Sequence, residues 1–239
     1  MAIWNPWRGC HKYSSGCLNC YIHKADERKG INTDHIVKTN QFDYPVQKNK
    51  KGEYKIKSGT LVYLCFQSDF FIEDADSWRV DCWNMIKERH DVTFLFLTKR
   101  IKRFFNCIPN DWADGYPNVI ISTTVEDQIS VDERLSFFQT LPIKHKNIVC
   151  QPLLEQIDLS PYLNGIDLVV VGGESGKNTR VMDFDWVLDI RKQCVEHNVS
   201  FQFRQVSSNF MKDNKRYSIQ PKLLTAQARS ANINFLSNK

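Results

Sequence analysis

The chain has 239 residues, of which 42% are hydrophobic and 25% charged, as in an ordinary folded domain. Its length fits a single α/β barrel and allows a core that is stable without disulfide bonds. The N-terminal residues lack the pattern of a signal peptide, and no stretch reaches the roughly 18 apolar residues of a membrane span. We therefore expect a cytoplasmic protein without membrane contact, in which thiols stay reduced.

The net charge of +5 is unevenly distributed along the chain. Residues 211–239 contain six basic residues and one acid, Asp213, so this segment alone accounts for the net charge. A second basic run, from Gln47 to Lys57, has five lysines and one glutamate. Such runs are either solvated surface or contacts for the phosphates of a nucleotide or nucleic acid.

Hydrophobic patterning predicts helices and strands in alternation. After a short helix over 18–29, residues 31–59 form a polar excursion with a hairpin turn at Lys51–Gly52. Apolar runs then predict strands at 60–66, 92–98, 118–125, 147–151, 167–173 and 199–205. Helices are expected at 76–89, 99–107, 131–140 and 183–197, the last one capped by Asp183 or Asp185.

Strands that are apolar on both faces and alternate with helices indicate a parallel sheet covered by helices. A further strand near residues 4–8 would bring the number to seven. A right-handed βα series of that size closes into a partial or full TIM-like barrel, and a doubly wound sheet is the alternative. We expect one (β/α) barrel domain over residues 1–210 and a basic C-terminal extension over 211–239 that docks on it.

The segment WNPWRGCHKYSSGCLNCY carries Cys10, Cys17 and Cys20 on one loop. A structural zinc site needs a fourth protein ligand, such as His11 or His23, and a thioredoxin-type pair does not need Cys10. An iron–sulfur cluster on three cysteines keeps one iron free for a substrate or cofactor, and we favour this interpretation. The remaining cysteines are expected to be buried apolar side chains; they are Cys65, Cys82, Cys107, Cys150 and Cys194.

A second motif, VVVGGESG, follows a predicted strand. Gly172 and Gly173 let the backbone approach a ligand closely, and Glu174 is suited to an amine or hydroxyl; a tight turn with positive φ is the alternative. Other polar residues also cluster at strand ends, where α/β folds place their sites, although each taken singly fits a helix cap or ion pair equally well. They are Ser68, Asp69, Thr98, Lys99, Arg100, Thr124, Glu126, Gln151, Ser175, Arg204 and Gln205.

Residues 3 to about 210 resemble the phage gene-product 37/68 family, which has a three-cysteine motif and a domain of unknown function. The matching motifs occur in order: WNPWRGC-x6-CLNCY, SDFF, FLTKR, TTVED, PLL, VVVGGESG, DWVLDIRKQC and F-x-F-R-Q. That family is similar to radical S-adenosylmethionine enzymes. The resemblance implies a [4Fe–4S] cluster on Cys10, Cys17 and Cys20, with S-adenosylmethionine on the fourth iron and an external electron donor. Candidate cofactor-binding residues are Asp69, Thr124, Gly172, Gly173, Glu174 and Ser175.

The chain departs from the family pattern at several positions. The cysteine spacing is C-x6-C-x2-C in place of C-x3-C-x2-C, and Gly-Gly-Glu follows a late strand instead of an early one. Gln151 stands where relatives have Glu, and Arg204 takes the place of the Lys in their F-K-Q-W-G signature. Gln cannot act as a carboxylate base, and Arg stays protonated near neutral pH.

From these features we expect an enzyme that generates a 5′-deoxyadenosyl radical and acts on a nucleotide or nucleic acid. Lys99, Gln151 and Arg204 are the candidate catalytic residues, with Lys99 and Arg100 suited to a substrate phosphate. The alternative is a zinc-stapled barrel that binds nucleic acid without catalysis.

Overall fold

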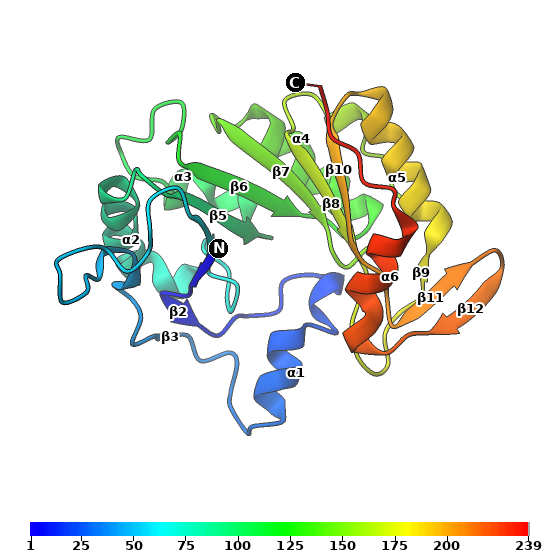
Figure 1. Ribbon diagram of the computed structural model, residues 1–239, viewed down its shortest axis with the longest axis horizontal. Helices are drawn as coiled ribbons and strands as arrows, with labels where there is room; N and C mark the ends of the chain where they lie inside the picture. The colour runs from blue at the N-terminus through cyan, green and yellow to red at the C-terminus, as the bar shows by residue number, and fades with distance from the viewer. Residues whose placement is uncertain (239) are drawn as a thin grey trace. The chain divides into compact units, whose positions relative to one another are not determined.

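The computed structural model describes residues 1–238, which form a mixed α/β fold (Figure 1). Its main sheet has seven strands in the order β1-β4-β5-β6-β7-β8-β10. Their bounds are Ala2–Trp4, Leu61–Leu64, Thr93–Thr98, Val119–Thr124, His145–Cys150, Leu168–Gly172 and Ser200–Gln205. The pairs β1–β4, β4–β5, β7–β8 and β8–β10 are all parallel. The predicted parallel α/β architecture is therefore confirmed.

Six α-helices and two small sheets complete the described part of the chain. The helices are α1 Tyr21–Glu27, α2 Asp76–Glu88, α3 Phe104–Cys107, α4 Gln128–Thr140, α5 Phe184–Glu196 and α6 Leu224–Ala231. One small sheet pairs β2 (Trp7–Arg8) with β3 (Val37–Lys38), and the other contains β9 (Met182–Asp183), β11 (Asn209–Lys212) and β12 (Lys215–Ser218). Among the helices described, none has the length and apolar character to cross a membrane.

The chain divides into two compact units. Unit 1 contains residues 1–12, 22–122 and 142–145, and unit 2 contains 13–21, 123–141 and the described residues from 146 onward. The boundary falls inside the cysteine-rich loop, so Cys10 belongs to unit 1 while Cys17 and Cys20 belong to unit 2.

In unit 1, alternation along the strands builds the core. Val62 and Phe94 are paired neighbours with no exposed surface, as are Leu64 and Phe96, whereas the intervening residues of β4 and β5 are half-buried. The ring of Trp7 stacks on Phe70 at 5.4 Å between centroids, which adds to the area buried.

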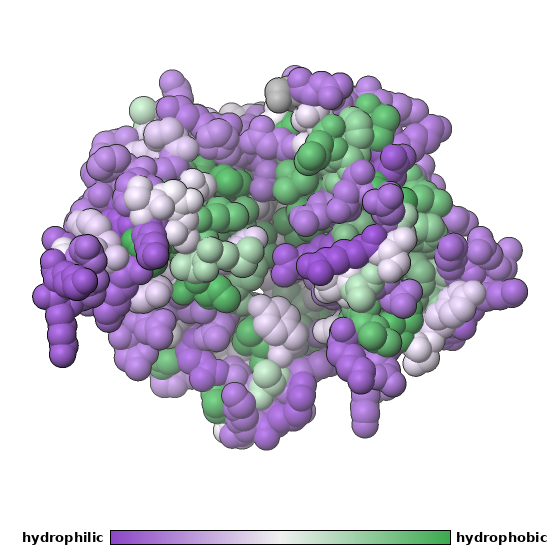
Figure 2. All heavy atoms as spheres, viewed as in Figure 1, coloured by the Kyte–Doolittle hydropathy of each residue, from purple (hydrophilic) through white to green (hydrophobic). Residues whose placement is uncertain are grey.

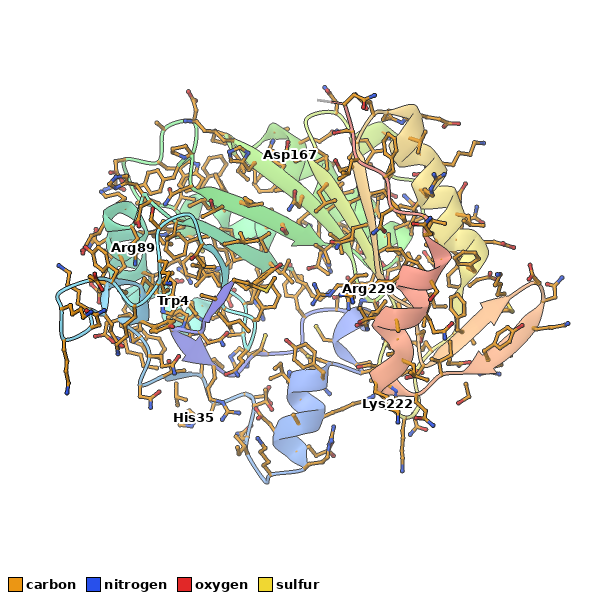
Figure 3. The ribbon with its side chains drawn as sticks, in the orientation of Figure 1. Trp4, His35, Arg89, Asp167, Lys222 and Arg229 are labelled. Carbon is orange, nitrogen blue, oxygen red and sulfur yellow. The ribbon has the colours of Figure 1, made fainter. Side chains whose placement is uncertain are left out.

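In unit 1, the polar excursion over residues 31–59 is held by a buried side chain from outside it. Arg89 follows the end of α2 and is fully buried (Figure 3). Its guanidinium donates to the carbonyls of Pro45 and Ile56 and pairs with Asp91. Lys48 and Tyr54 form an antiparallel bridge, and Gly52 has φ of +81°, so the predicted hairpin is confirmed.

In unit 2, α5 and α6 both pack against β10 (Figure 1). Leu224 at the start of α6 is buried, and Phe235 forms an antiparallel bridge with Phe201 of β10. The segment from residue 211 onward therefore contributes packed side chains and main-chain hydrogen bonds to unit 2.

The main differences from the sequence-based expectations lie at element ends. The N-terminal strand of the main sheet is Ala2–Trp4, and Trp7–Arg8 pairs elsewhere. The first helix begins at Tyr21 and α4 begins at Gln128, because Asp127 caps it in a capping box with Ser130. The five scattered cysteines are buried, as predicted.

Candidate metal and cofactor site

Cys10 lies in unit 1, two residues after the end of β2. Gly9, which precedes it, has φ of +95°, and a Cβ there would lie 2.7 Å from the carbonyl oxygen of His35. Only glycine fits both the backbone conformation and the contact. The amide of Cys10 donates to the carbonyl of Thr33 at 2.8 Å, which fixes the loop.

A buried arginine stands beside this thiol. Nη1 of Arg100 is 4.0 Å from Sγ of Cys10, and Nη2 donates to the carbonyl of His11 at 3.1 Å. Burial opposes the charge of this guanidinium, but Asp69 and Cys10 more than offset burial and raise its pKa. Cys10 therefore faces the cation of Arg100, while its own thiol donates to the carbonyl of His11 at 3.4 Å.

The predicted cofactor-binding residue Asp69 serves its own unit. Its carboxylate accepts from Thr98 Oγ1 at 2.8 Å and from the amide of Lys99 at 3.0 Å, and it pairs with Arg100 at 3.2 Å. Asp69 is 5% exposed, so these partners surround its carboxylate. Its role in the structure is to position Arg100 beside Cys10.

Cys17 and Cys20 belong to one turn of unit 2. Cys17 ends a 3-10 turn over Ser15–Cys17, and the amide of Cys20 donates to its carbonyl at 3.2 Å. The amide of Tyr13 lies 3.5 Å from Cys17 Sγ and donates to it. The turn thus presents two thiols three residues apart, one of them with an N–H donor on its sulfur, as occurs in iron–sulfur sites.

Glu126, two residues beyond β6, anchors one side of this turn. Its carboxylate has no exposed surface and forms an ion pair with Arg134 of α4 at 3.0 Å. It also accepts hydrogen bonds from the hydroxyl of Ser14 and, at 3.3 Å, from the amide of Gly16. Glu126 therefore holds the segment immediately before Cys17.

Glu174, two residues beyond β8, anchors the other side. Asn19, between the two cysteines, donates to its carboxylate at 3.0 Å. Arg180 donates to the same carboxylate through its amide at 2.7 Å and through its guanidinium, with which it forms an ion pair. Two glutamates at strand ends of unit 2, each neutralised by an arginine, thus fix the turn that carries Cys17 and Cys20.

Gly172 and Gly173 make room for protein atoms. A Cβ on Gly172 would lie 2.8 Å from the side chain of Gln151, and one on Gly173 would lie 2.5 Å from the amide of Ser207. Neither residue has positive φ within the described chain, so the alternative of a positive-φ turn is wrong. The close approach that the sequence indicates is to Gln151 and to the segment after β10.

The remaining predicted site residues have different environments. Thr124 is buried at the end of β6, where its carbonyl accepts from Arg134 at 2.6 Å. Ser175 and Gln151 are half-buried, and Arg204 on β10 is exposed. Within the described residues, the buried hydroxyl of Thr123 has no hydrogen-bond partner, which leaves an unsatisfied polar group beside Thr124.

The structure thus forms two clusters of predicted residues. Unit 1 brings Cys10, Asp69 and Lys99 together around Arg100, and unit 2 brings Cys17, Glu174 and the glycines together. Among residues 1–238, no group of three or more His, Cys, Asp and Glu side chains forms a ready metal site. The donor set itself, three cysteines on one short loop and outside any disulfide bond, fits a soft metal or an iron–sulfur cluster.

Sequence reasoning missed Arg134, Asn19 and Ser14. Arg134 lies on α4, eight residues after the glutamate that it neutralises, with no motif around it. Asn19 and Ser14 read as ordinary loop residues, and their acceptors lie more than 110 residues away in the sequence. Long-range pairs of this kind leave no local signal.

The chain belongs to the family described as protein of unknown function (DUF5131), which it matches over residues 1–232. No curated protein and no solved structure matches the chain.

Proposed function

For this member of a family of unknown function, we propose the activity of a radical S-adenosylmethionine-type enzyme. Cys10, Cys17 and Cys20 hold a [4Fe–4S] cluster in this proposal. The observation that carries it is the preformed turn with Cys17 and Cys20, which Glu126 and Glu174 fix at strand ends of a parallel sheet. Carboxyl ends of parallel strands are where α/β folds build their sites.

The chemistry of the donor set supports a cluster. Thiolates are the ligands of iron–sulfur centres, and none of the three cysteines is in a disulfide bond. The guanidinium of Arg100 lies 4.0 Å from the sulfur of Cys10, and the Tyr13 amide donates to the sulfur of Cys17. Such charges and hydrogen bonds tune a cluster's reduction potential.

When bound, the cluster would supply one electron, taken from an external donor, to cleave S-adenosylmethionine into methionine and a 5′-deoxyadenosyl radical. The chain's own residues position and shield this chemistry. Glu126 and Glu174 hold the cysteine turn, and Asp69 holds Arg100 against Cys10. Lys99, Gln151 and Arg204 are the residues we assign to substrate.

The resemblance assigns the cofactor's amino group to Gly-Gly-Glu. In unit 2, the carboxylate of Glu174 already accepts from Asn19 and Arg180. We therefore assign Glu174 to positioning the cysteine turn and assign the cofactor to Ser175 and the end of β6 at Thr124. The finer architecture that goes with this function is a partial TIM-like barrel, which is what the resemblance to radical S-adenosylmethionine enzymes implies.

A zinc-stapled, non-catalytic nucleic-acid-binding protein is the second candidate. The observation that favours it is His23, which is hydrogen-bonded to the backbone of Cys10. A ring nitrogen of His23, as the fourth ligand beside the three cysteine sulfurs, would complete a Cys₃His zinc site.

A cofactor-cleavage assay tests the proposal. Protein reconstituted with iron and sulfide under anaerobic conditions is mixed with dithionite and S-adenosylmethionine, and 5′-deoxyadenosine is measured. We expect product from the wild type and from Cys82→Ala, a buried-thiol control, and none from Cys20→Ala. No product from a wild type that carries its full cluster would contradict the proposal.

A further inference from the structure

We propose that the β11–β12 hairpin is a nucleic-acid-binding surface and that it delivers a nucleic-acid substrate to unit 2. The delivery step rests on the proposed function, because it names the substrate class of that site. Binding itself needs no cluster.

The hairpin carries a concentration of exposed positive charge. Lys212, Lys215 and Arg216 are all exposed, and Figure 2 shows the hairpin covered by hydrophilic side chains. Lys222 and Arg229, around the start and end of α6, extend this charge along the chain (Figure 3). Within the described residues, none of these five cations forms an ion pair with a carboxylate. Arg216 donates to the side chain of Asn209 and Lys212 lies over the ring of Phe184, but both partners are neutral, so the positive charge can still attract an external polyanion.

The register of the hairpin adds a local cost that an anion relieves. Lys212 and Lys215 are directly opposite each other across the strands. Like charges at such positions repel and destabilise the pair. The connecting residues, Asp213 and Asn214, both have positive φ, as a tight two-residue hairpin turn requires. The turn thus keeps two lysines at opposite positions of the hairpin, with the Lys212 ammonium 5.4 Å from the centre of the Phe184 ring, and a phosphate near the turn would reduce their repulsion.

The shape and chemistry of β12 favour nucleic acid over a lipid surface. β12 is the edge of its sheet, and all four of its residues are exposed. A two-stranded β-ribbon of this kind fits the major groove of a duplex, and the half-exposed ring of Tyr217 can stack on an unpaired base. Apart from this tyrosine, β12 has no large apolar side chain with which to enter a bilayer.

The hairpin is joined directly to the segment that fixes the cysteine turn. The amide of Ser208, just before β11, donates to the carbonyl of Glu174 at 2.9 Å. The side chain of Asn209 donates to the carbonyl of Thr179 at 3.0 Å, and β11 pairs with β9. Because Glu174 also binds Asn19, nucleic acid on the hairpin lies beside the elements that position Cys17 and Cys20.

Fluorescence anisotropy with labelled single-stranded and duplex DNA and with RNA tests this surface. Full-length protein is compared with the triple variant Lys212→Ser, Lys215→Ser, Arg216→Ser. The matched control is Lys50→Ser, Lys51→Ser, which removes exposed lysines from the other basic hairpin, in unit 1. Circular dichroism and unfolding midpoints verify that each variant is folded. Each titration is run at several salt concentrations, with and without the cluster.

We expect the triple variant to bind at least about tenfold more weakly and the control to bind like the wild type. Because each phosphate contact contributes about 0.7 to 0.9 to the slope of log K against log salt, the triple variant should lose about two units of slope. Equal losses in both variants, or binding only to anionic lipid vesicles, would overturn the proposal. Hairpin-dependent binding by cluster-loaded wild type that releases no 5′-deoxyadenosine would reject the proposed enzyme and leave the surface standing.

Discussion

At the level of single residues, the site depends on carboxylates that are neutralised by arginines. Glu126 pairs with Arg134, Glu174 with Arg180, and Asp69 with Arg100. A buried carboxylate without such a partner would be strongly destabilised. Each pair leaves lone pairs that accept hydrogen bonds from loop residues, so these charges position loops instead of remaining available to a ligand.

Breaking the most buried of these pairs should be costly. In Glu126→Gln, Arg134 remains in the core without a counter-charge, so we expect a loss of about 3–5 kcal/mol in the free energy of unfolding. Urea denaturation measures this loss, and hydrogen exchange should show faster exchange over residues 13–17. The control Glu196→Gln removes an exposed pair with Lys192 and should cost less than about 1 kcal/mol. Similar stabilities for both variants would contradict this account of Glu126.

The two adjacent glycines should differ in tolerance to alanine. A Cβ at Gly173 meets the backbone of Ser207, whereas a Cβ at Gly172 meets only the side chain of Gln151. Overpacking costs about 1–3 kcal/mol, so Gly173→Ala should be the more destabilising change. Adding Gln151→Ala should rescue Gly172→Ala but leave Gly173→Ala unchanged. Thermal unfolding of these four variants and of Gln151→Ala alone measures both effects, and rescue of Gly173→Ala would show that the assigned contact is wrong.

At the level of elements, the sequence pattern was sufficient for the long strands and helices. Runs such as 92–98 and 167–173 are apolar enough to predict buried parallel strands, and the structure confirms them. The pattern failed for β11 and β12, because a fully exposed strand such as Lys215–Ser218 has no apolar face to produce periodicity. β1 was misplaced for a related reason. A three-residue edge strand is too short for its period to be recognised.

Helix α5 offers a test of which aspartate begins it. Asp183 accepts a hydrogen bond from the amide of Asp185 at 3.0 Å, so Asp183 is the N-cap and Asp185 lies in the first turn. Asp183→Ala should therefore cost about 0.5–2 kcal/mol. Asp185→Ala loses only the interaction with the helix dipole, about 0.3–1 kcal/mol. Urea denaturation of both variants compares them directly, and a larger loss for Asp185→Ala would reverse the assignment.

At the level of the whole molecule, buried thiols make stability sensitive to alkaline pH. Burial raises the pKa of Cys107 to about 11 and that of Cys194 to about 12, from an unperturbed 9.0. Above about pH 9 the unfolded chain releases these protons while the folded protein retains them, so stability falls as pH rises towards 11. Below pH 9 both states are protonated and the effect is absent.

Urea midpoints measured from pH 8 to pH 10.5 should therefore decline. Each thiol contributes a slope of up to about 1.4 kcal/mol per pH unit. The double variant Cys107→Ala, Cys194→Ala is less stable at pH 8 because it creates cavities, but its decline with pH should be shallower. Parallel declines in the two proteins would show that these thiols do not titrate on unfolding.

The sequence predicted the chemistry of the candidate site better than its geometry. Three cysteines on a short loop are a local pattern, and so is Gly-Gly-Glu after a strand. The partners that decide what these groups do come from distant segments, such as Ser14 for Glu126 and Ser207 for Gly173. Glu174 consequently looked like a cofactor ligand in the sequence, while in the structure it holds Asn19.

Metal analysis of anaerobically purified protein tests the central claim most directly. Iron, acid-labile sulfide and zinc are determined for the wild type, Cys10→Ala and the buried-thiol control Cys82→Ala, with optical spectra before and after dithionite. We predict about four irons and four sulfides per chain in the wild type and the control, with visible absorption that bleaches on reduction. Cys10→Ala should lose them. One zinc without iron in the wild type, or iron unchanged in Cys10→Ala, would contradict the cluster.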